Sequence, residues 1–183
     1  MKILVASDIH GSAYYCRQLL GAIGRENPDK VLLLGDLLYH GPRNDLPREY
    51  SPKEVIAALN SISDRLLCVR GNCDAEVDQM VLNFPIMADY ALLYVGGRTI
   101  FATHGHIYGE SNRPKLNSGD ILLCGHTHVA KCTDLSGVIY ANPGSVSLPK
   151  EDTARGYIIV NEGGLTVHTL DGDQYDRYSF VRS

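Results

Sequence analysis

The chain has 183 residues, 44% of them hydrophobic, which predicts one domain over residues 1–183 built around one sizeable core. A net charge of −4 excludes a broad basic surface, so no obligate nucleic-acid partner is expected. No apolar run approaches the roughly 20 residues that cross a membrane, the N-terminal run is too short for a signal peptide, and five cysteines without disulfide spacing favour the reducing cytoplasm.

An apolar run over residues 2–7 predicts a strand buried on both faces, and this strand ends at Asp8 and His10. Side chains two residues apart point to the same side of an extended backbone, so these two should face one point beyond the strand. A turn carboxylate next to a surface histidine would show the same pattern. Ser12 then predicts the N-cap of a helix over residues 13–24.

A second strand is predicted over residues 30–34, and it ends at Asp36. Strand, helix and strand in this order predict a parallel pair with a right-handed crossover. Asp36 should therefore lie at the sheet edge that holds the preceding pair, where open α/β folds bind their ligands. Ser51 and the following Pro predict a helix over residues 51–62, and a third strand over residues 66–69 leads to Asn72.

The second half of the chain contains short apolar segments separated by glycines, which predict hairpins and a largely antiparallel second sheet. These segments are residues 91–95, 99–103, 138–141, 157–160, 165–170 and 178–181. The fold class expected from the whole pattern is α/β, with two packed mixed β-sheets in a sandwich flanked by α-helices.

Seven side chains of the kinds that bind cations follow predicted strands. They are Asp8, His10, Asp36, Asn72, His104, His126 and His128. The last two follow an apolar strand over residues 121–124, and their spacing predicts that both imidazoles face one common point, as two ligands of one metal would. Two surface histidines in a turn would give the same spacing.

Several short motifs occur in a characteristic order. They are Asp8-Ile9-His10, Gly35-Asp36, Gly71-Asn72-Cys73-Asp74, His104-Gly105-His106 and Gly125-His126-Thr127-His128. In this order they resemble the calcineurin-like metallophosphoesterase superfamily. Within it, three segments make the chain most similar to small bacterial phosphodiesterases. These are His40-Gly41-Pro42-Arg43-Asn44, Gly71-Asn72-Cys73-Asp74 and Asn142-Pro143-Gly144-Ser145.

The resemblance implies a centre of two divalent metal ions that share one bridging carboxylate. One ion would bind Asp8, His10, Asp36 and His128, and the other Asp36, Asn72, His104 and His126. Imidazole, carboxylate and amide ligands without thiolate favour manganese, zinc, iron, nickel or cobalt over calcium or magnesium, with manganese as first choice. A carboxylate suits the bridge because its two oxygens can serve two cations.

The resemblance also implies an enzyme, a phosphodiesterase that hydrolyses a small phosphodiester by in-line attack of a metal-bridging hydroxide. The first alternative is a phosphomonoesterase on the same centre, which needs more positive charge for a dianion. Arg43 is the main candidate for that charge. The second is a non-catalytic scaffold, as in a retromer subunit of this fold that has lost ligands. Homo-oligomerisation is left open.

Cys73 departs from the family pattern. Many members have a histidine there, held by the following aspartate, which is thought to protonate the leaving alkoxide. A thiol with a pKa near about 8.5 donates a proton less readily. The alternative interpretation is that Cys73 is a small packed residue and that Asp74 caps the next helix.

Four further polar residues are candidates for roles around the metals. Arg43 and His40 are candidate phosphate or substrate contacts, although both also fit a solvated loop. Asn72 is a candidate substrate ligand as well as a metal ligand. His106, two residues after His104, is expected to support the centre or to contact substrate rather than to ligate directly.

Overall fold

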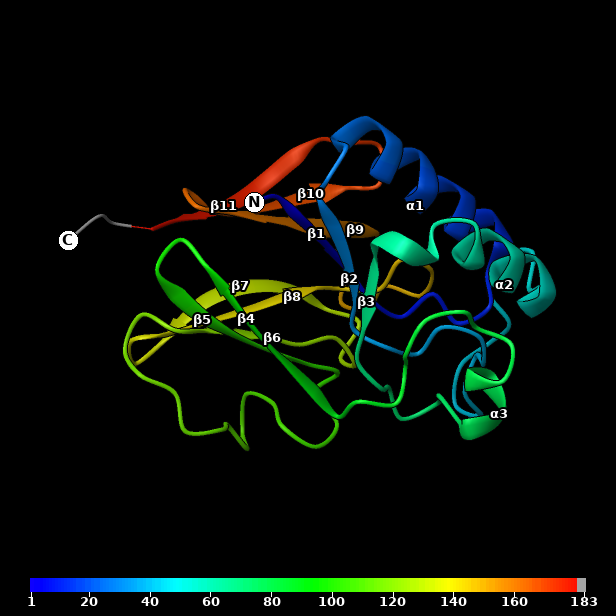
Figure 1. Ribbon diagram of the computed structural model, residues 1–183, viewed down its shortest axis with the longest axis horizontal. Helices are drawn as coiled ribbons and strands as arrows, with labels where there is room; N and C mark the ends of the chain where they lie inside the picture. The colour runs from blue at the N-terminus through cyan, green and yellow to red at the C-terminus, as the bar shows by residue number, and fades with distance from the viewer. Residues whose placement is uncertain (181–183) are drawn as a thin grey trace.

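Two β-sheets pack face to face in the computed structural model, which describes residues 1–180 (Figure 1). Along the chain the strands are β1 (Ile3–Ala6), β2 (Lys30–Leu33), β3 (Leu66–Cys68), β4 (Tyr90–Val95), β5 (Arg98–Thr103), β6 (Ile121–Leu123), β7 (Ala130–Leu135), β8 (Val138–Pro143), β9 (Gly156–Asn161), β10 (Gly164–Thr169) and β11 (Gln174–Ser179). One sheet has the order β11-β10-β9-β1-β2-β3, and the other β4-β5-β6-β8-β7. The expected α/β fold of two packed mixed sheets is confirmed.

Two helices cover the face of the six-stranded sheet that points away from the five-stranded sheet, and a third, short helix lies beyond the ends of the strands (Figure 1). They are α1 (Ala13–Glu26), α2 (Pro52–Asn60) and the short α3 (Glu76–Gln79), with a 3-10 turn, η1 (Ser63–Arg65). Ser12 caps α1 as predicted, because its hydroxyl accepts a hydrogen bond from the backbone N–H of Tyr15. None of the helices within residues 1–180 combines the length and the apolar character needed to cross a bilayer.

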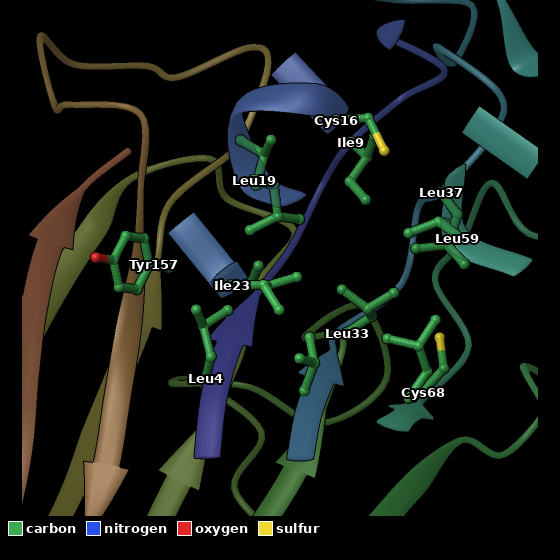
Figure 2. Close-up of a cluster of buried hydrophobic side chains, with 14 of the residues drawn as sticks. Leu4, Ile9, Cys16, Leu19, Ile23, Leu33, Leu37, Leu59, Cys68 and Tyr157 are labelled. Carbon is green, nitrogen blue, oxygen red and sulfur yellow. The ribbon is translucent and has the colours of Figure 1, made fainter. Parts of the chain in front are cut away.

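The first sheet begins as the sequence predicts. β1 pairs in parallel with β2, and β2 with β3, so α1 is the crossover between the first two strands. Alternate residues of β1 enter two different apolar clusters. Leu4 packs toward the helices with Leu19 and Leu33 (Figure 2), whereas Val5 packs between the sheets. Burial on both faces explains why this strand is apolar without alternation.

The assignment of the late strands to the second sheet was wrong. The predicted segments 157–160, 165–170 and 178–181 correspond to β9, β10 and β11, which extend the first sheet beyond β1; residue 181 lies outside the described residues. Glycine turns specify which strands form a hairpin, but they carry no information about the sheet that the hairpin joins. The continuous apolar run in β9 fits a central strand, since it is paired on both sides with β1 and β10.

The second sheet also differs from the prediction. β5, β6 and β8 pair in parallel, so only the outer pairs β4–β5 and β7–β8 are antiparallel. The sequence interpretation also missed β7, because its burial pattern is mostly intermediate and it lacks a clear apolar face. The parallel arrangement matters for the site, since it brings the carboxyl ends of β5 and β6 to one edge of the sheet.

Candidate metal centre

The candidate ligands lie in left-handed backbone turns just beyond the strands. Asp8 has φ of 60°, His10 of 50°, Asp36 of 55°, His126 of 66° and His128 of 62°. The argument from extended backbone was therefore wrong, because these turns set the directions of the side chains. Left-handed conformations cost about 1–3 kcal/mol each for residues other than glycine, so the surrounding structure must hold these turns in place.

The first group of side chains consists of Asp8, His10 and His128, all of them buried. Asp8 Oδ1 lies 3.4 Å from Nε2 of His10 and 3.2 Å from Nε2 of His128. The two Nε2 atoms are 3.1 Å apart. The other carboxylate oxygen of Asp8 accepts hydrogen bonds from the Ser7 hydroxyl and from the His126 N–H, whereas buried Oδ1 has no hydrogen-bond partner within residues 1–180.

Backbone carbonyls fix the tautomer of three histidines. Nδ1 of His10 lies 2.7 Å from the Tyr39 oxygen, and Nδ1 of His128 lies 2.7 Å from the Leu148 oxygen. His104 makes the same contact with a strand carbonyl at 2.6 Å. A carbonyl only accepts, so each Nδ1 carries a hydrogen, and the neutral ring keeps on Nε2 a lone pair that can bind a cation. Lone pairs 3.1 Å apart beside a carboxylate repel each other, and a cation between them removes the repulsion.

Asp36 lies between the two groups of histidines. Its Oδ2 is 3.7 Å from Nε2 of His10 and 3.4 Å from Nε2 of His104. Its Oδ1 accepts a hydrogen bond of 2.8 Å from the N–H of Cys73. The Asp36 carboxylate is therefore anchored to the backbone of Cys73 through Oδ1, and its Oδ2 faces histidines of both groups.

The second group forms around His104. Asn72 Oδ1 is 3.1 Å from its Nε2, and the ring of His126 lies 5.1 Å from its ring. The ring of His128 lies instead 5.0 Å from that of His10. The expectation that His126 and His128 face one common point was wrong, since successive left-handed turns send them to different groups. All seven candidate ligands nevertheless lie at one edge of the paired sheets.

The electrostatics of the centre suit cations. Burial alone would raise the pKa of Asp8, but the adjacent imidazoles of His10 and His128 hold it well below its usual value. Burial alone would lower the pKa of His104, but the carboxylates of Asp36 and Asp8 raise it to about 9. Negative charge that holds a proton so firmly will also attract a metal ion, and imidazole and carboxylate donors fit a divalent transition metal.

Two glycines allow the ligand loops to approach one another. A Cβ atom on Gly71 would overlap Asp36 Oδ1, and one on Gly125 would overlap the Ser7 hydroxyl and lie 2.8 Å from Asp8 Oδ2. Any side chain at either position would displace a candidate ligand. These glycines are therefore required by the close approach of neighbouring loops to the carboxylates.

Asp74 is buried and holds three backbone groups near the centre. Its carboxylate accepts from the N–H groups of Asp36 at 2.8 Å, Leu37 at 2.9 Å and Gly71 at 2.7 Å. The alternative in which Asp74 caps the next helix was wrong, because the N-cap of α3 is Ala75. Asp74 instead ties the loop after β2 to the loop after β3.

A loop from β8 supports the turn at Asp8. The hydroxyls of Ser145 and Ser147 donate to the Asp8 carbonyl at 2.8 and 3.1 Å, and Asn142 Nδ2 donates to the Gly125 carbonyl at 2.7 Å. The Asn142-Pro143-Gly144-Ser145 motif thus packs beside the candidate ligands. Sequence reasoning missed Ser147, which follows the motif without a signal of its own.

A cleft of about 410 Å³ opens over the centre. Its lining includes His10, Asp36, Asn72, Cys73, His126, His128 and two cationic side chains, Arg43 and Lys150. Lys150 was not predicted from the sequence. Its backbone N–H donates a hydrogen bond of 3.0 Å to the carbonyl of His128, which brings it beside the candidate ligands. His40 is not among the lining residues; its ring packs edge-on against Tyr39 and Tyr50. Its placement gives no support to a substrate contact.

Cys73 and His106 occupy different positions around the centre. Cys73 is half-buried in the cleft, and burial, together with the charges of Asp36 and Asp74, raises the pKa of its thiol to about 12. The ring of His106 lies 5.4 Å from that of His104, on the side of the second group. Its buried Nδ1 has no hydrogen-bond partner in the described part of the chain.

Comparison with known proteins agrees with this geometry. The profile of the calcineurin-like phosphoesterase superfamily domain matches residues 1–163. The chain belongs to the calcineurin-like phosphoesterase superfamily. Membership implies divalent metal ions, and the clusters of Asp8, His10 and His128 and of Asp8, Asp36 and His104 are candidate ligands.

Individual members of the superfamily resemble the chain over nearly its whole length. Phosphodiesterase YfcE of Escherichia coli K12 is 41% identical over 171 residues, which cover 93% of each chain. Its solved structure matches with a TM-score of 0.94 at 39% identity and covers 98% of this chain and 99% of that one. The solved structure of a single mutant of Vps29 from Entamoeba histolytica is 21% identical in sequence. It matches with a TM-score of 0.61 and covers 99% of this chain and 100% of that one. At this identity the match shows the fold alone.

Proposed function

We propose that the protein is a metal-dependent phosphodiesterase that hydrolyses a small phosphodiester. The observation that carries the proposal is the 3.1 Å approach of the Nε2 atoms of His10 and His128, beside an unpartnered oxygen of Asp8. Both rings commit their Nδ1 hydrogens to backbone carbonyls, which leaves the two Nε2 atoms available to bind a cation. The likeness to the phosphodiesterase YfcE supports the reaction class.

The proposed centre takes two divalent ions, with manganese as first choice. One ion would bind Asp8, His10, Asp36 and His128, and the other Asp36, Asn72, His104 and His126. When bound, two such ions lower the pKa of water and neutralise charge on a phosphoryl group.

The protein groups around the centre bind and orient the substrate in this proposal. Arg43 and Lys150 at the cleft bind non-bridging phosphoryl oxygens, and guanidinium suits them because it offers paired donors. Asn72 can turn its amide hydrogens to an ester oxygen. Asp74 acts as a positioning residue, since it holds the backbone of Asp36.

The first expected result is that manganese-loaded protein hydrolyses bis(p-nitrophenyl) phosphate faster than p-nitrophenyl phosphate. A chelator should reduce the diesterase rate to background, and added Mn²⁺ should restore it, because activation of water is the chemistry that the bound ions would supply. Release of p-nitrophenol and metal analysis of the same samples measure both effects. Purified protein that binds no metal on titration would instead indicate a non-catalytic scaffold.

The second candidate function is a phosphomonoesterase on the same centre. Lys150 favours it, because the cleft holds two cationic side chains rather than the single arginine expected from the sequence. A monoester dianion carries one more charge than a diester and gains more from such cations. Faster hydrolysis of p-nitrophenyl phosphate than of the diester would decide for this candidate.

The substitution Cys73→His is expected to raise turnover up to about tenfold on diesters with poor leaving groups, since general acids contribute substantially to such steps. The thiol, with its pKa raised to about 12, is a weak proton donor at neutral pH. Alkyl esters should respond more than p-nitrophenyl esters, whose leaving group departs without protonation. Cys73→Ser is the matched control. Equal or lower turnover of alkyl esters in the histidine variant would count against a proton-transfer role at this position.

We further propose that residues 1–183 form one domain of a cytoplasmic protein. Two large apolar clusters that involve strands from both halves of the chain support one domain. Five unpaired cysteines support a reducing compartment.

A further inference from the structure

A second cavity of about 620 Å³ lies beside the metal cleft. It is lined by the loop that follows β5, by residues 124–127 just after β6, and by Tyr140 within β8. The loop is held in shape by a hydrogen bond from the Gly109 N–H to the Asn112 carbonyl at 3.1 Å and by one from Asn112 Nδ2 to the Ile107 carbonyl at 2.8 Å. The cavity is thus a built feature of the loop.

The second cavity adjoins the metal cleft, because His126 and Thr127 line both. It lies on the side of His104, whose ring is close to those of His126 and His106. Cys73 lines the metal cleft, near His10 and Asp36, and is not among the residues that line the second cavity. A substrate whose phosphorus sits over the centre therefore has space for one group in each direction.

The walls of the second cavity favour an uncharged planar group. Three rings line it, those of His106, His126 and Tyr140. The Tyr140 hydroxyl is buried and accepts from Asn142 Nδ2 at 3.3 Å, so its own hydrogen can be donated. The lining carboxylate, Glu110, is neutralised by Lys131 at 2.8 Å. Aromatic walls without net charge bind flat rings better than ions.

We propose that the second cavity binds the ester group that the substrate retains, and that this group is a neutral planar ring of aryl or heteroaryl type. This inference rests on the proposed phosphodiesterase function. The leaving group departs on the side of Cys73, while the retained ring lies among the three lining rings. The cavity then determines which diesters are hydrolysed well.

The test compares two diesters with the same leaving group. Bis(p-nitrophenyl) phosphate retains an aryl ring, whereas methyl p-nitrophenyl phosphate retains only a methyl group. The ratio of their kcat/KM values should exceed about tenfold in the manganese-loaded protein, since burial of a ring adds binding free energy. Ser111→Trp and Ile107→Trp, which fill the cavity from its lining, should lower this ratio about tenfold.

Ser118→Trp is the matched control, because it adds the same side chain at an exposed serine that lines neither the second cavity nor the metal cleft, and its ratio should stay as in the unmodified protein. Phenylphosphonate should also inhibit more strongly than methylphosphonate, and the tryptophan variants should remove that difference. Equal kcat/KM for the two diesters, or tryptophan variants that leave the ratio unchanged, would overturn the inference. Absence of hydrolysis of both diesters by metal-loaded protein would instead defeat the proposed function.

Discussion

The substitution Asp36→Asn is expected to lower kcat/KM for bis(p-nitrophenyl) phosphate by about three orders of magnitude, with a matching loss of bound metal. Oδ2 of Asp36 lies 3.7 Å from Nε2 of His10 in the first group and 3.4 Å from Nε2 of His104 in the second. An amide nitrogen in place of Oδ2 cannot bind a cation, and it removes the negative charge that two ions would share. Steady-state kinetics and metal content of the same preparation measure the effect.

The fold should survive this substitution. Asparagine retains an oxygen that can accept the Cys73 N–H, and the backbone N–H of residue 36 still donates to Asp74. Asp64→Asn is the control, because it makes the same chemical change at an exposed residue in η1. If the Asp36 variant kept its metal and most of its activity, the proposed bridge would be wrong.

The substitution Gly71→Ala should reduce activity by roughly a hundredfold and destabilise the protein by about 1–3 kcal/mol, although it removes no functional group. The added methyl would overlap Asp36 Oδ1 and push the carboxylate away from both histidine groups. Displacement of a ligand by an ångström is sufficient for losses of this size. Thermal unfolding and diester hydrolysis measure the two effects separately.

Gly21→Ala is the matched control for the glycine substitution. Gly21 lies in α1, and nothing lies within 4 Å of a Cβ placed there. Alanine should therefore stabilise the helix by about 0.5–1 kcal/mol and leave hydrolysis unchanged. An alanine at position 71 that behaved like the one at position 21 would show that the loops have room to adjust.

The chemistry of the site could be predicted from the sequence better than its geometry. The positions of Asp8, Asp36 and His128 at strand ends follow from apolar runs that stop at polar residues. Their directions could not be predicted, because left-handed φ at these residues is imposed by contacts between loops distant in the chain. Lys150 was missed for the same reason, since only the folded chain brings it beside His128.

The sequence could not specify which of the two sheets each hairpin joins. A hairpin such as β9–β10 forms from local turn residues, but its attachment to β1 depends on contacts over more than 150 positions, such as Leu4 with Ile159. Cys73 illustrates a related limit. The sequence supplies the chemistry of a thiol, whereas its raised pKa follows from burial beside Asp36.

The turn at Asp8 joins the two halves of the molecule. Its backbone carbonyl receives the hydroxyls of Ser145 and Ser147, and its carboxylate receives the N–H of His126, so one residue after the first strand is anchored to segments that are synthesised much later. Neither sheet carries a complete set of cation ligands. A nascent or truncated chain is therefore expected to be inactive until the last of these segments has docked, which limits hydrolysis to the fully assembled protein.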